Sequence, residues 1–139
     1  MSSNAVLFRP LHLGTLQLKN RIVMAPMTRS FSPGGIPGAN VAQYYRRRAE
    51  GNVGLIISEG VAIERPAAKY NASVPNFYGR DALAGWKQVI AGVHKAGGAM
   101  GPQLWHVGSG HEDPLKRPHA DLIDTPSGID KLGTLFGKP

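Results

Sequence analysis

The residue types best able to do chemistry occur in three short groups, each at the end of an apolar run. Thr28 supplies a hydroxyl, Gly60 has no side chain, and Gln103 supplies an amide that can both donate and accept. A glycine lets the backbone approach another molecule closely, and hydroxyl and amide groups can hydrogen-bond a polar ligand. Taken singly, each residue also suits a plainer role, as a strand-closing threonine, a turn glycine or a polar strand end.

Two weaker groups of polar residues follow the third apolar run. Gly108-Ser109-Gly110 could begin a phosphate-binding loop, but the third glycine is missing and downstream prolines prevent the helix that would hold the phosphate. His106, His111 and the pair Glu112-Asp113 could ligate a metal, yet the spacing of the histidines matches no standard ligand pattern. We therefore expect no metal site and assign no catalytic role to His106.

The apolar pattern predicts a hairpin followed by buried strands. Leucines lie on both sides of Gly14-Thr15 in two short alternating runs, which predicts a β-hairpin. Continuous apolar runs suit strands buried on both faces of a parallel sheet. Pro102 counts against a regular central strand in the last of these runs. The three predicted strands lie at 21–27, 53–58 and 99–105.

Two helices separate these strands. The first is predicted to begin with Asn40 as its N-terminal cap and to end at Gly51. The second has apolar residues at three- and four-residue spacings from Leu83 to Val93 and stops at Gly97-Gly98. Such alternation of strands and helices predicts a parallel sheet, in which the carboxyl ends of all three strands meet on one side.

Composition limits the possible classes of function. The 139 residues carry a formal net charge of +7 and no cysteine, which excludes disulfides and thiol catalysis. The densest basic run, Arg46-Arg47-Arg48, lies in a predicted amphipathic helix without interleaved aromatic residues, so a solvated helix face explains it better than a nucleic-acid site. We find no signal-peptide pattern and no apolar run long enough for a membrane helix, and we expect a cytoplasmic protein.

Five motifs resemble those of the old yellow enzymes and follow that family's order. The resemblance covers nearly the whole chain. It implies an α/β fold, the N-terminal part of a (β/α)8 TIM barrel with about three βα units and a leading β-hairpin. It also implies an FMN-dependent oxidoreductase that takes hydride from NAD(P)H and passes it to an activated alkene such as an enone or nitroalkene. The motifs are 18–29 (LKNRIVMAPMTR), 44–49 (YYRRRA), 57–60 (ISEG), 85–87 (GWK) and 103–108 (QLWHVG).

Carried over residue by residue, the resemblance implies a set of flavin contacts. The Thr28 hydroxyl would bond a carbonyl oxygen of the flavin ring, and a donor there favours the electron-rich reduced flavin. Trp105 would stand beside the flavin and shape the substrate pocket together with Tyr70. The implied cofactor-binding residues are Ala25, Pro26, Met27, Thr28, Gly60 and Gln103.

Two positions depart from the family's pattern near the substrate. A tyrosine often stands four residues before the proline of the second loop, but here that position is Asn71, with Tyr70 adjacent. Ser109 follows Gly108 where arginine is common. The family's proton donor and its pair of substrate-gripping residues would lie beyond Pro139. We therefore expect an unusual substrate end of the pocket.

The predicted organisation is one partial barrel domain. Residues 1–20 form a leading segment with the hairpin, 21–108 the strand-helix-strand-helix-strand unit, and 109–139 a long loop. Because a barrel of this kind takes about 250 residues, we expect a complementary polypeptide to supply the rest of it. The alternative is a non-catalytic barrel fragment that acts only as an association partner.

Overall fold

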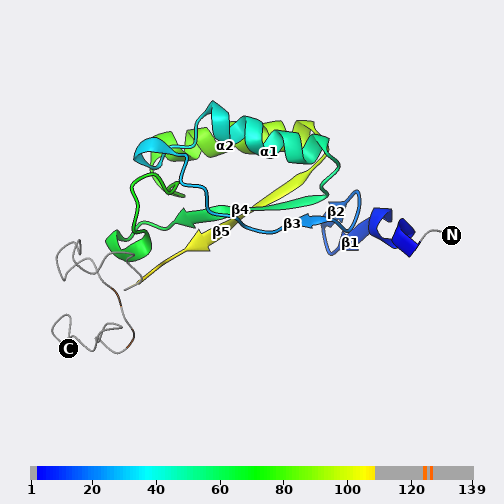
Figure 1. Cartoon of the computed structure of the whole chain (residues 1–139), viewed down its shortest axis with the longest axis horizontal. Helices are drawn as coiled ribbons and strands as arrows, with labels where there is room; N and C mark the ends of the chain where they lie inside the picture. The colour runs from blue at the N-terminus through cyan, green and yellow to red at the C-terminus, as the bar shows by residue number, and fades with distance from the viewer. Residues whose placement is uncertain (1–2, 109–123, 125, 127–139) are drawn as a thin grey trace.

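The computed structural model describes residues 3–108 together with Asp124 and Pro126. Two helices lie side by side on one face of a small parallel sheet, and a separate hairpin precedes them (Figure 1). The elements in chain order are η1 (Ser3–Phe8), β1 (Leu11–Leu13), β2 (Leu16–Leu18), β3 (Val23–Met24), η2 (Pro33–Gly35), α1 (Ala39–Glu50), β4 (Leu55–Ala62), η3 (Pro66–Ala68), α2 (Arg80–Lys95) and β5 (Ala99–Trp105).

The predicted hairpin and the predicted parallel sheet are both confirmed. β1 and β2 pair antiparallel around Gly14, whose φ of 57° lies in the left-handed region that glycine adopts easily. β4 is the central strand of the second sheet and pairs in parallel with β3 on one side and β5 on the other. The alternation of apolar runs and helices therefore predicts the order of elements correctly.

The core lies between the sheet and the two helices. The buried residues of α1 and α2 recur every three or four positions, as expected for amphipathic helices that cover a sheet. Met24 of β3 and Met100 of β5 pack against the same core from the two outer strands. Its buried members are Val41, Tyr45 and Ala49 of α1, Trp86, Val89 and Val93 of α2, and Ile56 and Val61 of β4.

β3 is shorter and less buried than the apolar run 21–27 predicts. It spans two residues, and Val23 is 52% exposed although Met24 packs against the core. The reason is that the described helices cover only one face of the sheet, so side chains that alternate to the other face remain open. Burial on both faces, the property assigned to this run, is therefore wrong for the described residues.

The start of α1 also differs from the prediction. Gly38 occupies the N-cap position, and Asn40 is the second residue inside the helix. Its side-chain amide instead donates a hydrogen bond to the carbonyl oxygen of Phe31, 3.1 Å away. Asn40 therefore ties the helix to the preceding loop but cannot act as the cap.

The ladder between β4 and β5 contains one irregularity, at the proline. Ile57 is paired with Gly101, and the next pair is Gly60 with Gln103. Two residues of β4 thus lie opposite the single Pro102, which has no N–H to donate. This arrangement is a β-bulge. The prediction that Pro102 disturbs the regular pairing of this strand is therefore confirmed. β5 keeps Pro102 because the neighbouring strand, β4, has one extra residue opposite it.

The bulge reverses the alternation of side chains along β4. Ile56 and Val61 are five positions apart, yet both face the helices, which a period of two cannot give without an inserted residue. The two residues of β4 opposite Pro102 are Ser58 and Glu59, and both are buried. The Ser58 hydroxyl accepts the N–H of Gln103 at 3.2 Å, in place of a regular ladder bond. β4 also continues to Ala62 beyond its predicted end.

Neither α-helix of the described residues is long and apolar enough to cross a membrane.

Two glycines of α2 give opposite predictions for replacement by alanine. A Cβ at Gly85 would collide with the backbone carbonyl oxygen of Pro37, whereas a Cβ at Gly92 would meet only carbons of Arg46, at 3.8 Å or more. Gly92→Ala should raise the free energy of unfolding by about 0.5–1 kcal/mol, the usual helical preference. Gly85→Ala should lower it by about 1–3 kcal/mol through overpacking. Urea denaturation measures both, and stabilisation by both variants would contradict the close packing of α2 on Pro37.

Candidate functional site

The three predicted strand ends meet at one side of the sheet. Gly60 of β4 is the ladder partner of Gln103 of β5. Thr28 follows β3, and the next residue, Arg29, donates its backbone N–H to the carboxylate of Glu59 at 3.2 Å. Glu59 directly precedes Gly60, so one hydrogen bond links the chain beside Thr28 to the chain beside Gly60. The structure thus brings the three residues together, and their roles toward a cofactor stay predictions.

Five of the six residues implied as flavin contacts are accessible to a ligand, and the sixth, Gly60, is buried. Ala25, Met27 and Thr28 are exposed, and Pro26 and Gln103 are half-buried. Together they offer a hydroxyl donor, an amide that donates and accepts, and apolar surface, which suits a planar ring with polar edges. The chemistry of the five accessible residues therefore fits FMN.

Trp105 and Tyr70, the predicted substrate-pocket residues, are in contact. Their ring centroids are 5.8 Å apart with an edge-to-face interplanar angle of 61°. A Cβ at Gly60 would lie 2.5 Å from the Trp105 ring, so this glycine makes room for the indole. The family resemblance implies a different role for Gly60, which is to let the backbone approach the flavin closely. In the structure its immediate neighbour is the Trp105 side chain.

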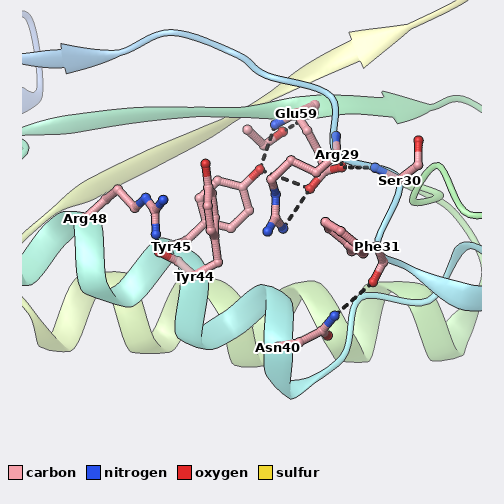
Figure 2. Close-up of polar contacts among 9 residues, drawn as sticks. Arg29, Ser30, Phe31, Asn40, Tyr44, Tyr45, Arg48 and Glu59 are labelled. Atoms are coloured by element: carbon pink, nitrogen blue, oxygen red, sulfur yellow. Dashed lines mark hydrogen bonds and ion pairs between the residues drawn. The ribbon is translucent and has the colours of Figure 1, made fainter.

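A buried ion pair behind the strand ends was not singled out by the sequence analysis (Figure 2). The Glu59 side chain is fully buried, and its Oε1 lies 3.1 Å from Nη2 of Arg29. Oε1 also accepts a hydrogen bond from the Tyr45 hydroxyl at 3.3 Å, and that hydroxyl accepts the Glu59 backbone N–H at 2.8 Å. Oε2 accepts the backbone N–H groups of Arg29 and Ser30. The carboxylate is thereby satisfied on both oxygens.

Burial raises the pKa of the Tyr45 hydroxyl well above its ordinary value. The hydroxyl therefore stays protonated at neutral pH and can donate to Glu59 while accepting the backbone N–H.

Tyr44 lies between two arginines. The guanidinium carbon of Arg29 is 3.6 Å from the Tyr44 ring centroid, and that of Arg48 is 3.4 Å from it. Such cation–π contacts hold a guanidinium in place by its face. Arg46 forms an exposed ion pair with Glu50. The solvated-face explanation of the run 46–48 therefore holds for Arg46 but not for half-buried Arg48.

A sequence signal for the Glu59 ion pair exists, but it is not local. Arg29 and Glu59 both lie inside quoted motifs, one residue beyond Thr28 and one before Gly60. Charges in those places favour pairing if the strands are neighbours. The direction of the Glu59 side chain depends on the bulge opposite Pro102, and strand alternation alone places it on the wrong face.

His106, to which no catalytic role is assigned, lies at the end of β5 in contact with Asp124. Its Nε2 is 2.9 Å from Asp124 Oδ2, and Arg65 bonds both oxygens of the same carboxylate at 3.1 and 2.7 Å. These hydrogen bonds, that of Arg65 first, lower the pKa of Asp124. The contact is solvent-exposed. The other weaker candidates, Ser109-Gly110, His111 and Glu112-Asp113, lie outside the described residues.

Gly60→Ala should displace the Trp105 ring. The added Cβ would meet the ring at 2.5 Å, so the indole must leave its contact with Tyr70. We expect a shift in tryptophan emission in a Trp86→Phe background, where Trp105 is the remaining tryptophan. Gly101→Ala is the matched control, because no atom lies within 4 Å of its added Cβ. An unchanged spectrum for Gly60→Ala would show that Trp105 does not pack on this glycine.

Comparison with known proteins gives curated relatives of two kinds. The chain is 42% identical over 104 residues to 12-oxophytodienoate reductase 7 of Oryza sativa subsp. japonica, covering 75% of this chain and 26% of that protein. It is 38% identical over 116 residues to the probable inactive dehydrogenase easA of Claviceps fusiformis, covering 82% of this chain and 30% of that one. The chain thus spans less than a third of the length of either relative.

Solved structures similar to this chain include members of the same family. Morphinone reductase in complex with tetrahydroNAD superposes with a TM-score of 0.71 at 42% identity, over 88% of this chain and 30% of the other. The old yellow enzyme homologue from Zymomonas mobilis gives 0.68 at 36% identity, over 74% and 28%. These neighbours are TIM barrels, so the predicted fold class is confirmed, although the described residues do not close a barrel. The family model described as NADH:flavin oxidoreductase / NADH oxidase matches residues 6–134, and the chain belongs to this family, that of the old yellow enzymes.

Proposed function

We propose that this chain forms the flavin-binding front of an FMN-dependent ene-reductase, completed by the rest of the barrel. The activity is transfer of hydride from NAD(P)H to the activated C=C bond of an enone, nitroalkene or related electrophile. The observation that carries the proposal is the meeting of the chain segments that carry Thr28, Gly60 and Gln103 at one side of the sheet, in a chain of this family. A solved relative that holds tetrahydroNAD supports a nicotinamide reductant.

FMN, when bound, supplies the hydride chemistry, and the residues of this chain bind and orient it. The Thr28 hydroxyl would donate to a carbonyl oxygen of the ring, and a preorganised donor at such a place would favour the reduced flavin. Gln103 holds the ring edge with its amide. Trp105 and Tyr70, whose rings are in contact, would form one wall of the substrate pocket.

Completion of the barrel is part of the proposal. β3 and β5 are the outer strands of the described sheet, and each has an edge without a partner among the described residues. Large apolar side chains lie exposed near these edges, including Val23, Met27 and Leu104 at 52%, 51% and 59%. Open strand edges of this kind pair with further strands or aggregate. We propose that a complementary polypeptide carrying the remaining five βα units pairs with both edges.

A second candidate function is association without catalysis. It is favoured by one observation, the similarity to a relative described as a probable inactive dehydrogenase.

Reconstitution separates the two candidates. The chain is co-expressed with the missing five βα units, and the purified complex is examined for bound flavin by its visible absorption and for NAD(P)H-driven reduction of a simple enone. We expect a yellow complex that turns over, whereas the chain alone should be inactive. A colourless complex would remove the flavoenzyme proposal and leave association. An active, FMN-loaded monomer of residues 1–139 would remove the proposed partner.

Thr28→Ala tests the hydroxyl in that complex. We expect FMN to be retained and its reduction by NAD(P)H to slow by about 5- to 150-fold, which corresponds to one hydrogen bond of about 1–3 kcal/mol acting in the transition state. Thr15→Ala, in the exposed turn of the hairpin, is the matched control and should leave the rate unchanged. Stopped-flow measurement of the reductive half-reaction decides the matter, and a wild-type rate for Thr28→Ala would remove this residue from the mechanism.

A further inference from the structure

We propose that Glu59 is a positioning residue for the flavin-binding strand ends, because its buried carboxylate holds the chain that follows Thr28 against the end of β4. This inference rests on the proposed function and adds a residue to it. The Glu59 side chain points toward the helices, and its carboxylate is bonded to Arg29, Ser30 and Tyr45, none of which is a residue implied to contact the flavin ring (Figure 2).

Two backbone contacts join Glu59 to the turn that follows Thr28. Oε2 of Glu59 accepts the N–H of Arg29 at 3.2 Å and that of Ser30 at 3.3 Å. Arg29 is the covalent neighbour of Thr28, and Glu59 that of Gly60. The relative position of the two predicted flavin contacts is therefore set through this one carboxylate rather than through a ladder bond, since β3 ends at Met24.

The Glu59 carboxylate also holds strain in the turn that follows Thr28. Ser30 has a φ of 57°, in the left-handed region that non-glycine residues rarely adopt. A conformation of this kind persists where surrounding contacts over-determine it, and such residues gather at functional sites. The Ser30 N–H bond to Glu59 is such a contact. Without it, the turn after Thr28 would be free to relax toward ordinary backbone angles.

Stability alone is a poor reason for this ion pair. The Glu59 side chain is fully buried and that of Arg29 is 16% exposed. Desolvating two charges offsets much of their attraction, and apolar residues of similar volume often stabilise such a place as well or better. What an apolar residue cannot do is accept two backbone N–H groups at a chosen point. The hydrogen bonds of the Glu59 carboxylate thus contribute more to the position of the turn than to the stability of the core.

A set of four variants distinguishes positioning from stability. Glu59→Met keeps the size of the side chain but accepts no hydrogen bond, and Glu59→Gln keeps one acceptor oxygen for the N–H groups of Arg29 and Ser30. Tyr45→Phe weakens the same buried cluster on its other side, at Oε1 and the Glu59 N–H, without touching the turn. Glu50→Gln removes a carboxylate from an exposed ion pair of α1 and is the surface control.

The measurements are made on the reconstituted barrel. They are the FMN dissociation constant from flavin fluorescence, the urea midpoint of the apoprotein, and amide hydrogen exchange at Arg29 and Ser30 in the apoprotein. For Glu59→Met we expect an FMN dissociation constant raised about tenfold or more, as for loss of hydrogen bonds to a charged acceptor, together with faster exchange at both amides. Glu59→Gln should lie between Met and wild type, and it serves if the Met variant does not assemble.

The control variants fix the interpretation. Tyr45→Phe should lower the urea midpoint but leave the exchange at Arg29 and Ser30 slow and the FMN affinity within about threefold of wild type. Loss of FMN affinity in proportion to loss of stability across Glu59→Met, Glu59→Gln and Tyr45→Phe would overturn the inference and make Glu59 purely structural. Wild-type FMN affinity in Glu59→Met would overturn it as well. If the wild-type barrel takes up no FMN, the proposed function fails first and this role of Glu59 falls with it.

Discussion

The buried carboxylate of Glu59 is the contact on which the arrangement of the site depends. It joins three parts of the fold that no ladder bond joins: the turn after β3, the end of β4 and the side of α1 that carries Tyr45. A buried charge is tolerated only when it is paired and hydrogen-bonded. Both conditions are met here, by the Arg29 guanidinium and by two backbone N–H groups.

The direction of Glu59 has its own cause in the sequence, the proline of β5. Pro102 cannot donate to the ladder, so the sheet inserts one extra residue of β4 opposite it. The insertion turns Glu59 toward the helices and leaves Gly60 on the other side, beneath the Trp105 ring. The bulge in β4 thus puts the Glu59 carboxylate on the helix side of the sheet and Gly60, with the Trp105 ring against it, on the opposite side. Bulges next to functional sites commonly re-aim side chains in this way.

Much of this fold could be predicted from the sequence because its signals are local. The apolar runs of β4 and β5, the spacing of Trp86, Val89 and Val93, and the turn at Gly14 each depend on a few neighbouring residues. The direction of Glu59 could not, since it depends on Pro102, more than forty positions away. The exposure of Val23 was missed for a related reason. An apolar run predicts that a strand is covered on both faces, but the described residues supply helices for only one of them. The family resemblance supplied the roles of Thr28 and Gln103, and neither periodicity nor composition would have given them.

A structure of the reconstituted barrel with FMN would show whether these three strand ends form one side of a flavin site. We expect the Thr28 hydroxyl and the Gln103 amide to lie within hydrogen-bonding distance of the flavin ring, with the Gly60 backbone beside it and the Glu59 carboxylate still on the N–H groups of Arg29 and Ser30. A flavin bound elsewhere on the barrel, with Thr28 and Gln103 in solvent, would contradict this expectation.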